Sequence, residues 1–112
     1  MIIWHNNRCR KSRETLAILE ENKIQVDIVN YLEDTPSKSE LKETLKKLGL
    51  KAEDIIRKGE ADYKENFKGK ELSEDQWIDA MIKYPKLIER PIVIKGNKAV
   101  LGRHPENVKE LL

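Results

Sequence analysis

Residues 2–16 read IIWHNNRCRKSRETL, and this stretch joins a predicted strand to a predicted helix through a polar turn. The apolar run at residues 2–4 predicts a short β-strand. We expect the helix to span about residues 11–22, where apolar side chains recur with helical spacing. Cys9, the one cysteine in the chain, therefore lies where the strand meets the helix.

The position of Cys9 favours the ionised, nucleophilic form of its thiol. Backbone N–H groups at a helix N-terminus have no intrahelical partner, and the helix dipole adds positive potential there. The nearest cations act in the same direction; they are Arg8, Arg10, Lys11 and Arg13. A lone cysteine is more often a small buried side chain. Because its neighbours here are cationic, we interpret Cys9 as a nucleophile that attacks an anionic substrate.

Length and composition restrict the class of protein. The chain has 112 residues, which predicts a single domain over residues 1–112, and we expect a monomer. Its formal net charge is only +2, so the composition does not indicate a nucleic-acid partner. One cysteine cannot form an internal disulfide, and no apolar run is long enough to cross a membrane. We therefore expect a cytoplasmic protein with no membrane partner.

The chain beyond the first helix predicts a mixed sheet. Residues 25–32 form a second strand, which completes a βαβ unit with two parallel strands. Residues 92–94 and 99–101 form an antiparallel hairpin around a Gly-Asn dipeptide. A last helix begins at Pro105, and we expect it to bury three apolar residues, Val108, Leu111 and Leu112.

The middle of the chain predicts helices rather than strands. Capping boxes at Ser37 and Ser73 begin two of them, and Trp77 opens an amphipathic stripe in the second. The fold class is therefore α/β, with a mixed four-stranded sheet. Along the chain the elements follow the order β-α-β and then β-β-α, with a helical insertion over about residues 37–85 between these two parts. Cys9 then lies at the carboxyl end of the first strand, where open α/β sheets place their sites.

Three arginines are candidates for binding an oxyanion because each stands at the boundary of a predicted element. They are Arg57, Arg90 and Arg103. The planar guanidinium group can meet two oxygens of an oxyanion at once. The alternative is that each is an ordinary surface charge, since the chain has 22 Lys and Arg residues.

Several other kinds of thiol or metal site do not fit this sequence. A phosphatase-type loop would need an arginine six positions after the cysteine, where Thr15 stands. A dithiol C-x-x-C motif would need a cysteine at Ser12, so the motif is C-x-x-S, which requires an external thiol to finish a redox cycle. Two scattered histidines and one cysteine do not predict a metal site.

The segment from His5 to Leu16 resembles the start of the glutaredoxin-dependent arsenate reductase family. Three further segments resemble the same family in the same order: residues 55–60 (IIRKGE), residues 85–93 (PKLIERPIV), and Gly102 with Arg103. The resemblance covers nearly the whole chain, and it implies a thioredoxin-like fold. It also implies that Cys9 attacks arsenate, that glutathione then attacks the arsenic adduct, and that glutaredoxin resolves the mixed disulfide with release of arsenite.

The resemblance also implies roles for individual side chains, and no bound cofactor besides the co-substrate glutathione. His5, with Ser12 and Arg13, would support the thiolate. The three candidate arginines match the oxyanion-binding arginines of the family, and Pro91 would shape the site after a cis peptide bond. The sequence departs from the family pattern at three positions, Asn7, Arg10 and His104.

Two alternatives remain open at the level of sequence. One is a thiol oxidoreductase of the same fold that acts on another small substrate, such as a glutathione mixed disulfide. The other is a regulator or adaptor without enzyme activity, related to stress regulators that bind RNA polymerase. Those regulators usually carry a C-x-x-C switch, and Ser12 removes the second cysteine of that switch here.

Overall fold

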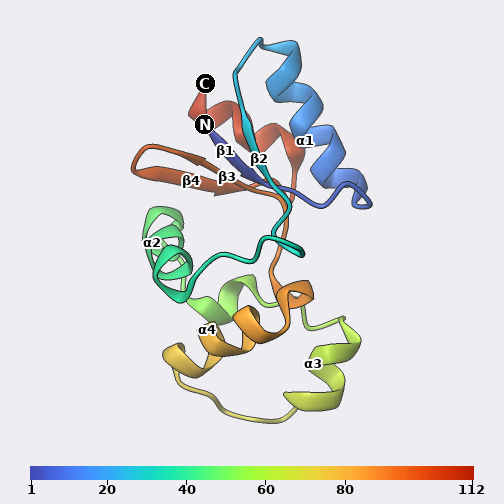
Figure 1. Cartoon of the computed structure of the whole chain (residues 1–112), viewed down its shortest axis with the longest axis vertical. Helices are drawn as coiled ribbons and strands as arrows, with labels where there is room; N and C mark the ends of the chain where they lie inside the picture. The colour runs from blue at the N-terminus through green and yellow to red at the C-terminus, as the bar shows by residue number, and fades with distance from the viewer.

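A computed structural model describes residues 1–112, and a four-stranded sheet lies at its centre (Figure 1). The strands are β1 (Ile2–Trp4), β2 (Asp27–Val29), β3 (Ile92–Lys95) and β4 (Lys98–Leu101), in the order β2-β1-β3-β4. β1 pairs in parallel with β2 and antiparallel with β3, and β3 pairs antiparallel with β4. The mixed sheet predicted from the sequence is confirmed.

The central strands are buried on both faces, because successive side chains of a strand point to opposite sides. On β1, Ile3 joins a cluster of five buried residues on one face, and Trp4 joins a cluster of 16 on the other. The smaller cluster lies under α1 (Arg10–Glu21) and the 3-10 helix η3 (Pro105–Leu111), which pack against each other. The two apolar faces hold the carboxyl end of β1, and Cys9 beyond it, in a fixed position.

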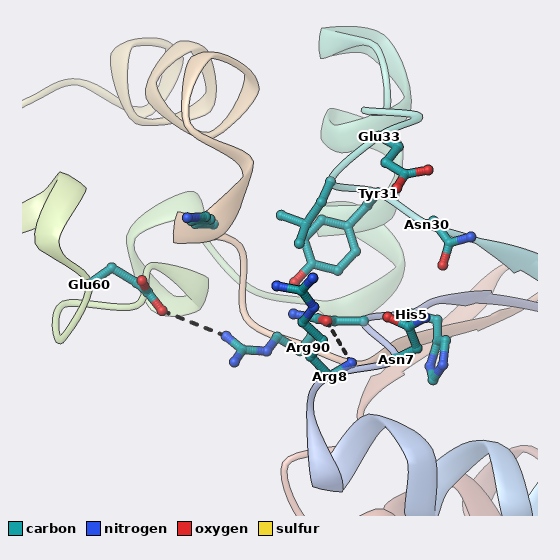
Figure 2. Close-up of a pocket in the computed structure, with 11 residues that line it drawn as sticks. His5, Asn7, Arg8, Asn30, Tyr31, Glu33, Glu60 and Arg90 are labelled. Carbon is teal, nitrogen blue, oxygen red and sulfur yellow. Dashed lines mark hydrogen bonds and ion pairs between the residues drawn. The ribbon is translucent and has the colours of Figure 1, made fainter.

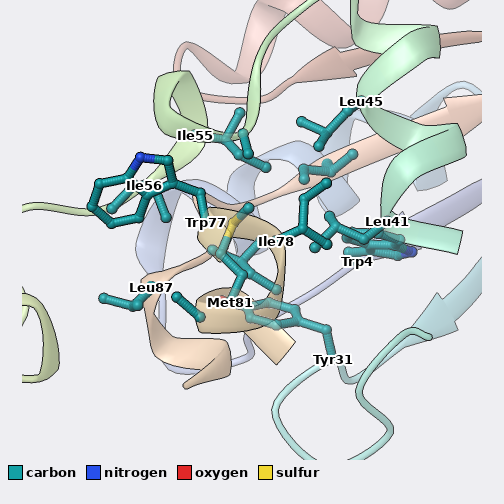
Figure 3. Close-up of a cluster of buried hydrophobic side chains, with 14 of the residues drawn as sticks. Trp4, Tyr31, Leu41, Leu45, Ile55, Ile56, Trp77, Ile78, Met81 and Leu87 are labelled. Carbon is teal, nitrogen blue, oxygen red and sulfur yellow. The ribbon is translucent and has the colours of Figure 1, made fainter. Parts of the chain in front are cut away.

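The helical insertion covers the face of the sheet opposite to α1 (Figure 1). Its elements are α2 (Lys38–Leu48), η1 (Ala52–Ile55), α3 (Ala61–Asn66), α4 (Glu74–Lys83) and η2 (Pro85–Leu87). Both predicted capping boxes are present at the starts of α2 and α4. Apolar side chains of α4 meet those of η1 and η2 in the larger cluster, as Figure 3 shows.

None of the helices combines the length and hydropathy that crossing a membrane requires.

The structure corrects the sequence analysis at three places. β2 is shorter than predicted because it is an edge strand whose only partner, β1, has three residues, and its Ile28 is 50% exposed. The last helix is a 3-10 helix, in which Val108 and Leu111 share a face at a spacing of three residues. Leu112 lies beyond that spacing and is 48% exposed, so its predicted burial is wrong.

Candidate functional site

Cys9 is the N-cap residue of α1, close to the helix start expected from the sequence. Its backbone N–H donates to the carbonyl of Asn6 at 2.9 Å, and its own carbonyl accepts from the N–H of Arg13 at 3.0 Å. The thiol is half-buried and makes no capping hydrogen bond. The first amides of α1 are therefore open to an anion that lies beside the sulfur.

A buried hydrogen-bond network holds the turn that carries Cys9. The Ser12 Oγ lies 2.6 Å from the His5 Nδ1, and it accepts from the backbone N–H of Asn6 at 3.1 Å. Both Ser12 and His5 are buried. The Ser12 hydroxyl can accept from Asn6 and donate to Nδ1 at the same time when the imidazole is neutral with its proton on Nε2.

The protonation state of His5 follows from its surroundings. Burial, and secondarily the charge of Arg13, lower the pKa of His5 below 6.5. The imidazole is thus neutral near pH 7 and contributes no positive charge of its own. Its contact is with Ser12. Any stabilisation of the Cys9 thiolate by His5 therefore acts through Ser12 and the turn.

The cations near Cys9 in the sequence go to different places in the fold. Arg10 pairs with Glu14 at 2.7 Å along the exposed side of α1. Arg13 donates from Nη1 to the carbonyl of Asn7 at 2.9 Å, which closes the turn. Arg8 lines a cavity beside the turn. The bulky Arg10, one of the departures from the family pattern, therefore lies along the helix, paired with a carboxylate.

Two of the predicted oxyanion arginines, Arg57 and Arg90, are brought together by pairing of distant segments. An isolated antiparallel bridge joins residues 55–57 to residues 87–89. Within it, the backbone N–H of Arg57 donates to the carbonyl of Leu87 at 2.8 Å. This bridge connects η1 to the segment before β3, so the two guanidinium groups approach the same place.

A carboxylate that the sequence analysis missed lies between these two arginines. The Glu60 Oε1 is 3.6 Å from the Arg57 Nη1 and 3.9 Å from the Arg90 Nη1, and Figure 2 shows the second of these pairs. Both separations are long for ion pairs. Arg57 Nη1 and Arg90 Nε are buried with no hydrogen-bond partner. Buried guanidinium donors are almost always satisfied in folded proteins, so these are available for a ligand.

Arg103 is held less tightly than the other two arginines. Its Nη2 donates to the Glu89 Oε2 at 3.0 Å, and its side chain is 51% exposed. The expected cis peptide bond is present between Arg90 and Pro91. The Pro91 carbonyl accepts from the N–H of Gly102 at 2.8 Å, which places Arg103 near the turn formed by Arg90 and Pro91.

Gly102 is required by the close approach of Pro91. A Cβ atom at this position would lie 2.6 Å from the Pro91 Cγ and 2.7 Å from the Thr15 Oγ1. We expect Gly102→Ala to lower the free energy of unfolding by about 1–3 kcal/mol, as overpacking of a buried position does, which urea denaturation measures. At Gly59 an added Cβ meets nothing within 4 Å, so Gly59→Ala is the matched control. Equal stability of the two variants would contradict this account.

A cavity of about 460 Å³ lies next to the Cys9 turn and is lined mostly by polar residues (Figure 2). Arg90 and the buried Tyr31 line it, whereas Cys9, Arg57 and Arg103 are not among its lining residues. The other lining residues are His5, Asn6, Asn7, Arg8, Asn30, Leu32, Glu33, Glu60 and Lys86. Nowhere in the chain do three His, Cys, Asp or Glu side chains gather in a way that could hold a metal ion.

Sequence reasoning missed Tyr31, although a signal for it exists. β1 and β2 are parallel neighbours, so the residues that follow their carboxyl ends meet at one edge of the sheet. Tyr31 follows β2 just as the Cys9 turn follows β1. For Glu60 and Glu89 no comparable signal exists, because their contacts with the arginines depend on the pairing of distant segments.

Comparisons with known proteins match this chain over nearly its full length. The sequence model of the ArsC family matches residues 4–111. A protein of Haemophilus influenzae named arsenate reductase is 45% identical, over 100% of this chain and 98% of that protein. A protein of Escherichia coli K12, called uncharacterized protein YfgD, is 46% identical over 98% of this chain and 94% of its own.

The solved structure of an arsenate reductase from Vibrio cholerae superposes with a TM-score of 0.94 and 47% sequence identity. The superposition covers 99% of this chain and 96% of that one, so it includes both the sheet and the helical insertion. The thioredoxin-like fold expected from the sequence is confirmed.

Proposed function

The chain belongs to the ArsC family, and we propose that it reduces arsenate to arsenite with Cys9 as the nucleophile. One observation carries the proposal: two half-buried arginines, Arg57 and Arg90, each keep a buried N–H donor that makes no hydrogen bond. Arg90 lines the cavity that adjoins the turn before Cys9, together with Asn6, Asn7 and Arg8. An anion bound by these donors would therefore lie near a thiol at a helix N-terminus.

The chemistry follows from the electron balance of arsenate reduction. The Cys9 thiolate attacks arsenic, an As–S bond forms, and one arsenate oxygen leaves as water. A second thiol then attacks the Cys9 sulfur, the two sulfurs form a disulfide, and arsenic takes two electrons and departs as arsenite. Because the chain has one cysteine, the second thiol must come from another molecule.

We assign the second thiol to glutathione and the regeneration step to glutaredoxin. Attack by glutathione would leave a mixed disulfide on Cys9, and glutaredoxin would reduce it by thiol–disulfide exchange. The half-exposed position of Cys9 at the start of α1 is compatible with the approach of an external thiol. Arg57, Arg90 and Arg103 would hold the oxygens of arsenate, and His5, Ser12 and Arg13 would hold the Cys9 turn.

An assay that couples arsenate to NADPH oxidation tests this function. The mixture contains glutathione reductase, glutathione and glutaredoxin, and each component is omitted in turn. Oxidation that requires arsenate, glutaredoxin and this protein supports the proposal. Turnover with thioredoxin and its reductase alone would contradict the choice of thiol donor. Turnover of a glutathione mixed disulfide, with none of arsenate, would instead favour a thiol oxidoreductase with a different substrate.

Removing the negative charge of Glu60 tests whether Arg57 and Arg90 bind the substrate. Glu60 competes with an oxyanion for Arg57 and Arg90, so Glu60→Gln is expected to lower the KM for arsenate. Partly exposed ion pairs contribute about 0.2–1 kcal/mol, which corresponds to a change of up to about fivefold. Steady-state kinetics over a range of arsenate concentrations measures the effect.

Glu53→Gln is the matched control for this measurement. Glu53 also pairs with a cation at 3.6 Å, but its partner is Lys58 and both side chains are 56% exposed. The control should leave the KM for arsenate unchanged. A KM that rises in Glu60→Gln would show that the carboxylate orients the arginines rather than competing with arsenate.

A further inference from the structure

Tyr31 combines a buried ring with a hydroxyl that has no partner. The residue follows β2 and is 1% exposed, and its ring lies at the edge of the larger apolar cluster (Figure 3). Its hydroxyl is buried and has no partner at hydrogen-bond geometry, although the Asn6 side chain lies nearby. Buried tyrosine hydroxyls usually have a partner, because leaving one unsatisfied destabilises the folded state. This hydroxyl is therefore suited to a ligand that enters from outside.

The surroundings of the hydroxyl indicate the chemical class of that ligand. Tyr31, Arg8 and Arg90 line the same cavity, as Figure 2 shows. The Nε of Arg90 also lacks a partner. The phenol of Tyr31 and the guanidinium group of Arg90 can both donate hydrogen bonds. They are therefore complementary to an oxyanion, which has negative charge and several acceptor oxygens.

The protonation state of Tyr31 supports a donating role. Burial raises the pKa of Tyr31 to about 12, against the opposing charge of Arg90 and the nearby Asn6 side chain. The charges of Cys9 and Glu89 act in the same direction as burial. The phenol therefore keeps its proton throughout the neutral range and can donate it in a hydrogen bond.

We propose that Tyr31 is a substrate-binding residue whose hydroxyl donates a hydrogen bond to an oxygen of the oxyanion that Arg90 binds. The inference rests on the proposed function. It adds an uncharged hydrogen-bond donor to the oxyanion site that the arginines form. Arg90 supplies positive charge, whereas Tyr31 supplies a donor from a ring that the core holds in place. A donor held in this way loses little conformational freedom when the oxyanion binds.

Arsenate binding to variants in a Cys9→Ser background tests this role without the chemical step. Tyr31→Phe removes only the hydroxyl and keeps the buried ring. A hydrogen bond to a charged group corresponds to an affinity change of about ten- to a hundredfold, so titration calorimetry should show an arsenate Kd weakened by that factor. The melting temperature without arsenate should not fall, because the lost hydroxyl has no partner in the folded protein.

Tyr63→Phe is the matched control. Tyr63 is partly buried and its ring stacks on Trp77 at 6.2 Å, but it does not line the cavity. Its arsenate Kd should equal that of the parent. In the Cys9-containing enzyme, Tyr31→Phe should raise the KM for arsenate and leave the KM for glutathione unchanged.

The outcomes separate this inference from the proposed function. If arsenate binds the parent and Tyr31→Phe equally, the role of Tyr31 is wrong and the proposed function stands. If arsenate binds neither the parent nor the Tyr63→Phe control, both are wrong. If, in the Cys9-containing enzyme, Tyr31→Phe changes only the rate at which iodoacetamide alkylates Cys9, the hydroxyl acts on the thiol and the inference is overturned. A melting temperature lowered in Tyr31→Phe, with unchanged affinity, would assign the hydroxyl a structural role instead.

Discussion

Cys9→Ser is expected to abolish arsenate reduction while leaving arsenate binding intact. Serine keeps the size and position of the N-cap side chain, but its hydroxyl is a far weaker nucleophile than a thiol. Loss of an essential nucleophile costs more than about a thousandfold in turnover, so the coupled assay should fall to its background rate. The arginines that would bind arsenate are unchanged in this variant, so calorimetry should still detect binding.

A protection experiment on the unmodified protein gives an independent check of the same assignment. Cys9 is the only thiol, so one equivalent of iodoacetamide should inactivate the enzyme and appear as one modification by mass spectrometry. Saturating arsenate should slow the modification, because the anion would lie between the reagent and the sulfur. Substantial turnover by Cys9→Ser, or alkylation at the same rate with and without arsenate, would contradict the role of Cys9 in this chemistry.

Arg90→Ala is expected to have the second-largest effect, a loss of about ten- to a hundredfold in kcat/KM for arsenate. The Arg90 side chain is 17% exposed and its Nε is buried without a partner, so an oxyanion would meet a largely desolvated charge. A charge-assisted hydrogen bond contributes about 1.5–3 kcal/mol, which corresponds to that factor. Arg90→Lys should recover only part of the activity, since an ammonium group cannot meet two oxygens with the same geometry.

The structure also ranks the three arginines, which the sequence cannot do. Arg57→Ala should resemble Arg90→Ala, because its Nη1 is likewise buried and makes no hydrogen bond, with Glu60 at the long distance of 3.6 Å. Arg103→Ala should cost less, since Arg103 is 51% exposed and already bound to Glu89. Lys42→Ala is the control, because Lys42 lies on α2 and pairs with Asp75. Full activity in both Arg57→Ala and Arg90→Ala would show that the oxyanion binds elsewhere.

The sequence by itself determined the elements whose signals are local. The apolar run before the Cys9 turn became β1, and the thiol lies at the N-cap of α1. The capping boxes at Ser37 and Ser73 formed as predicted, because each needs only two side chains three residues apart. The hairpin that joins β3 and β4 also followed from its turn residues.

Only the tertiary structure decided which charged and polar groups meet. Any of the 22 Lys and Arg residues could have faced solvent, and the pairing of residues 55–57 with residues 87–89 is what brings Arg57 and Arg90 together. The same long-range packing set Glu60 between them and buried the Tyr31 hydroxyl without a partner. Caps and turns are stabilised by residues that are neighbours in the sequence. A binding site is assembled by contacts between distant segments, and no local sequence pattern specifies which side chains these contacts bury or pair.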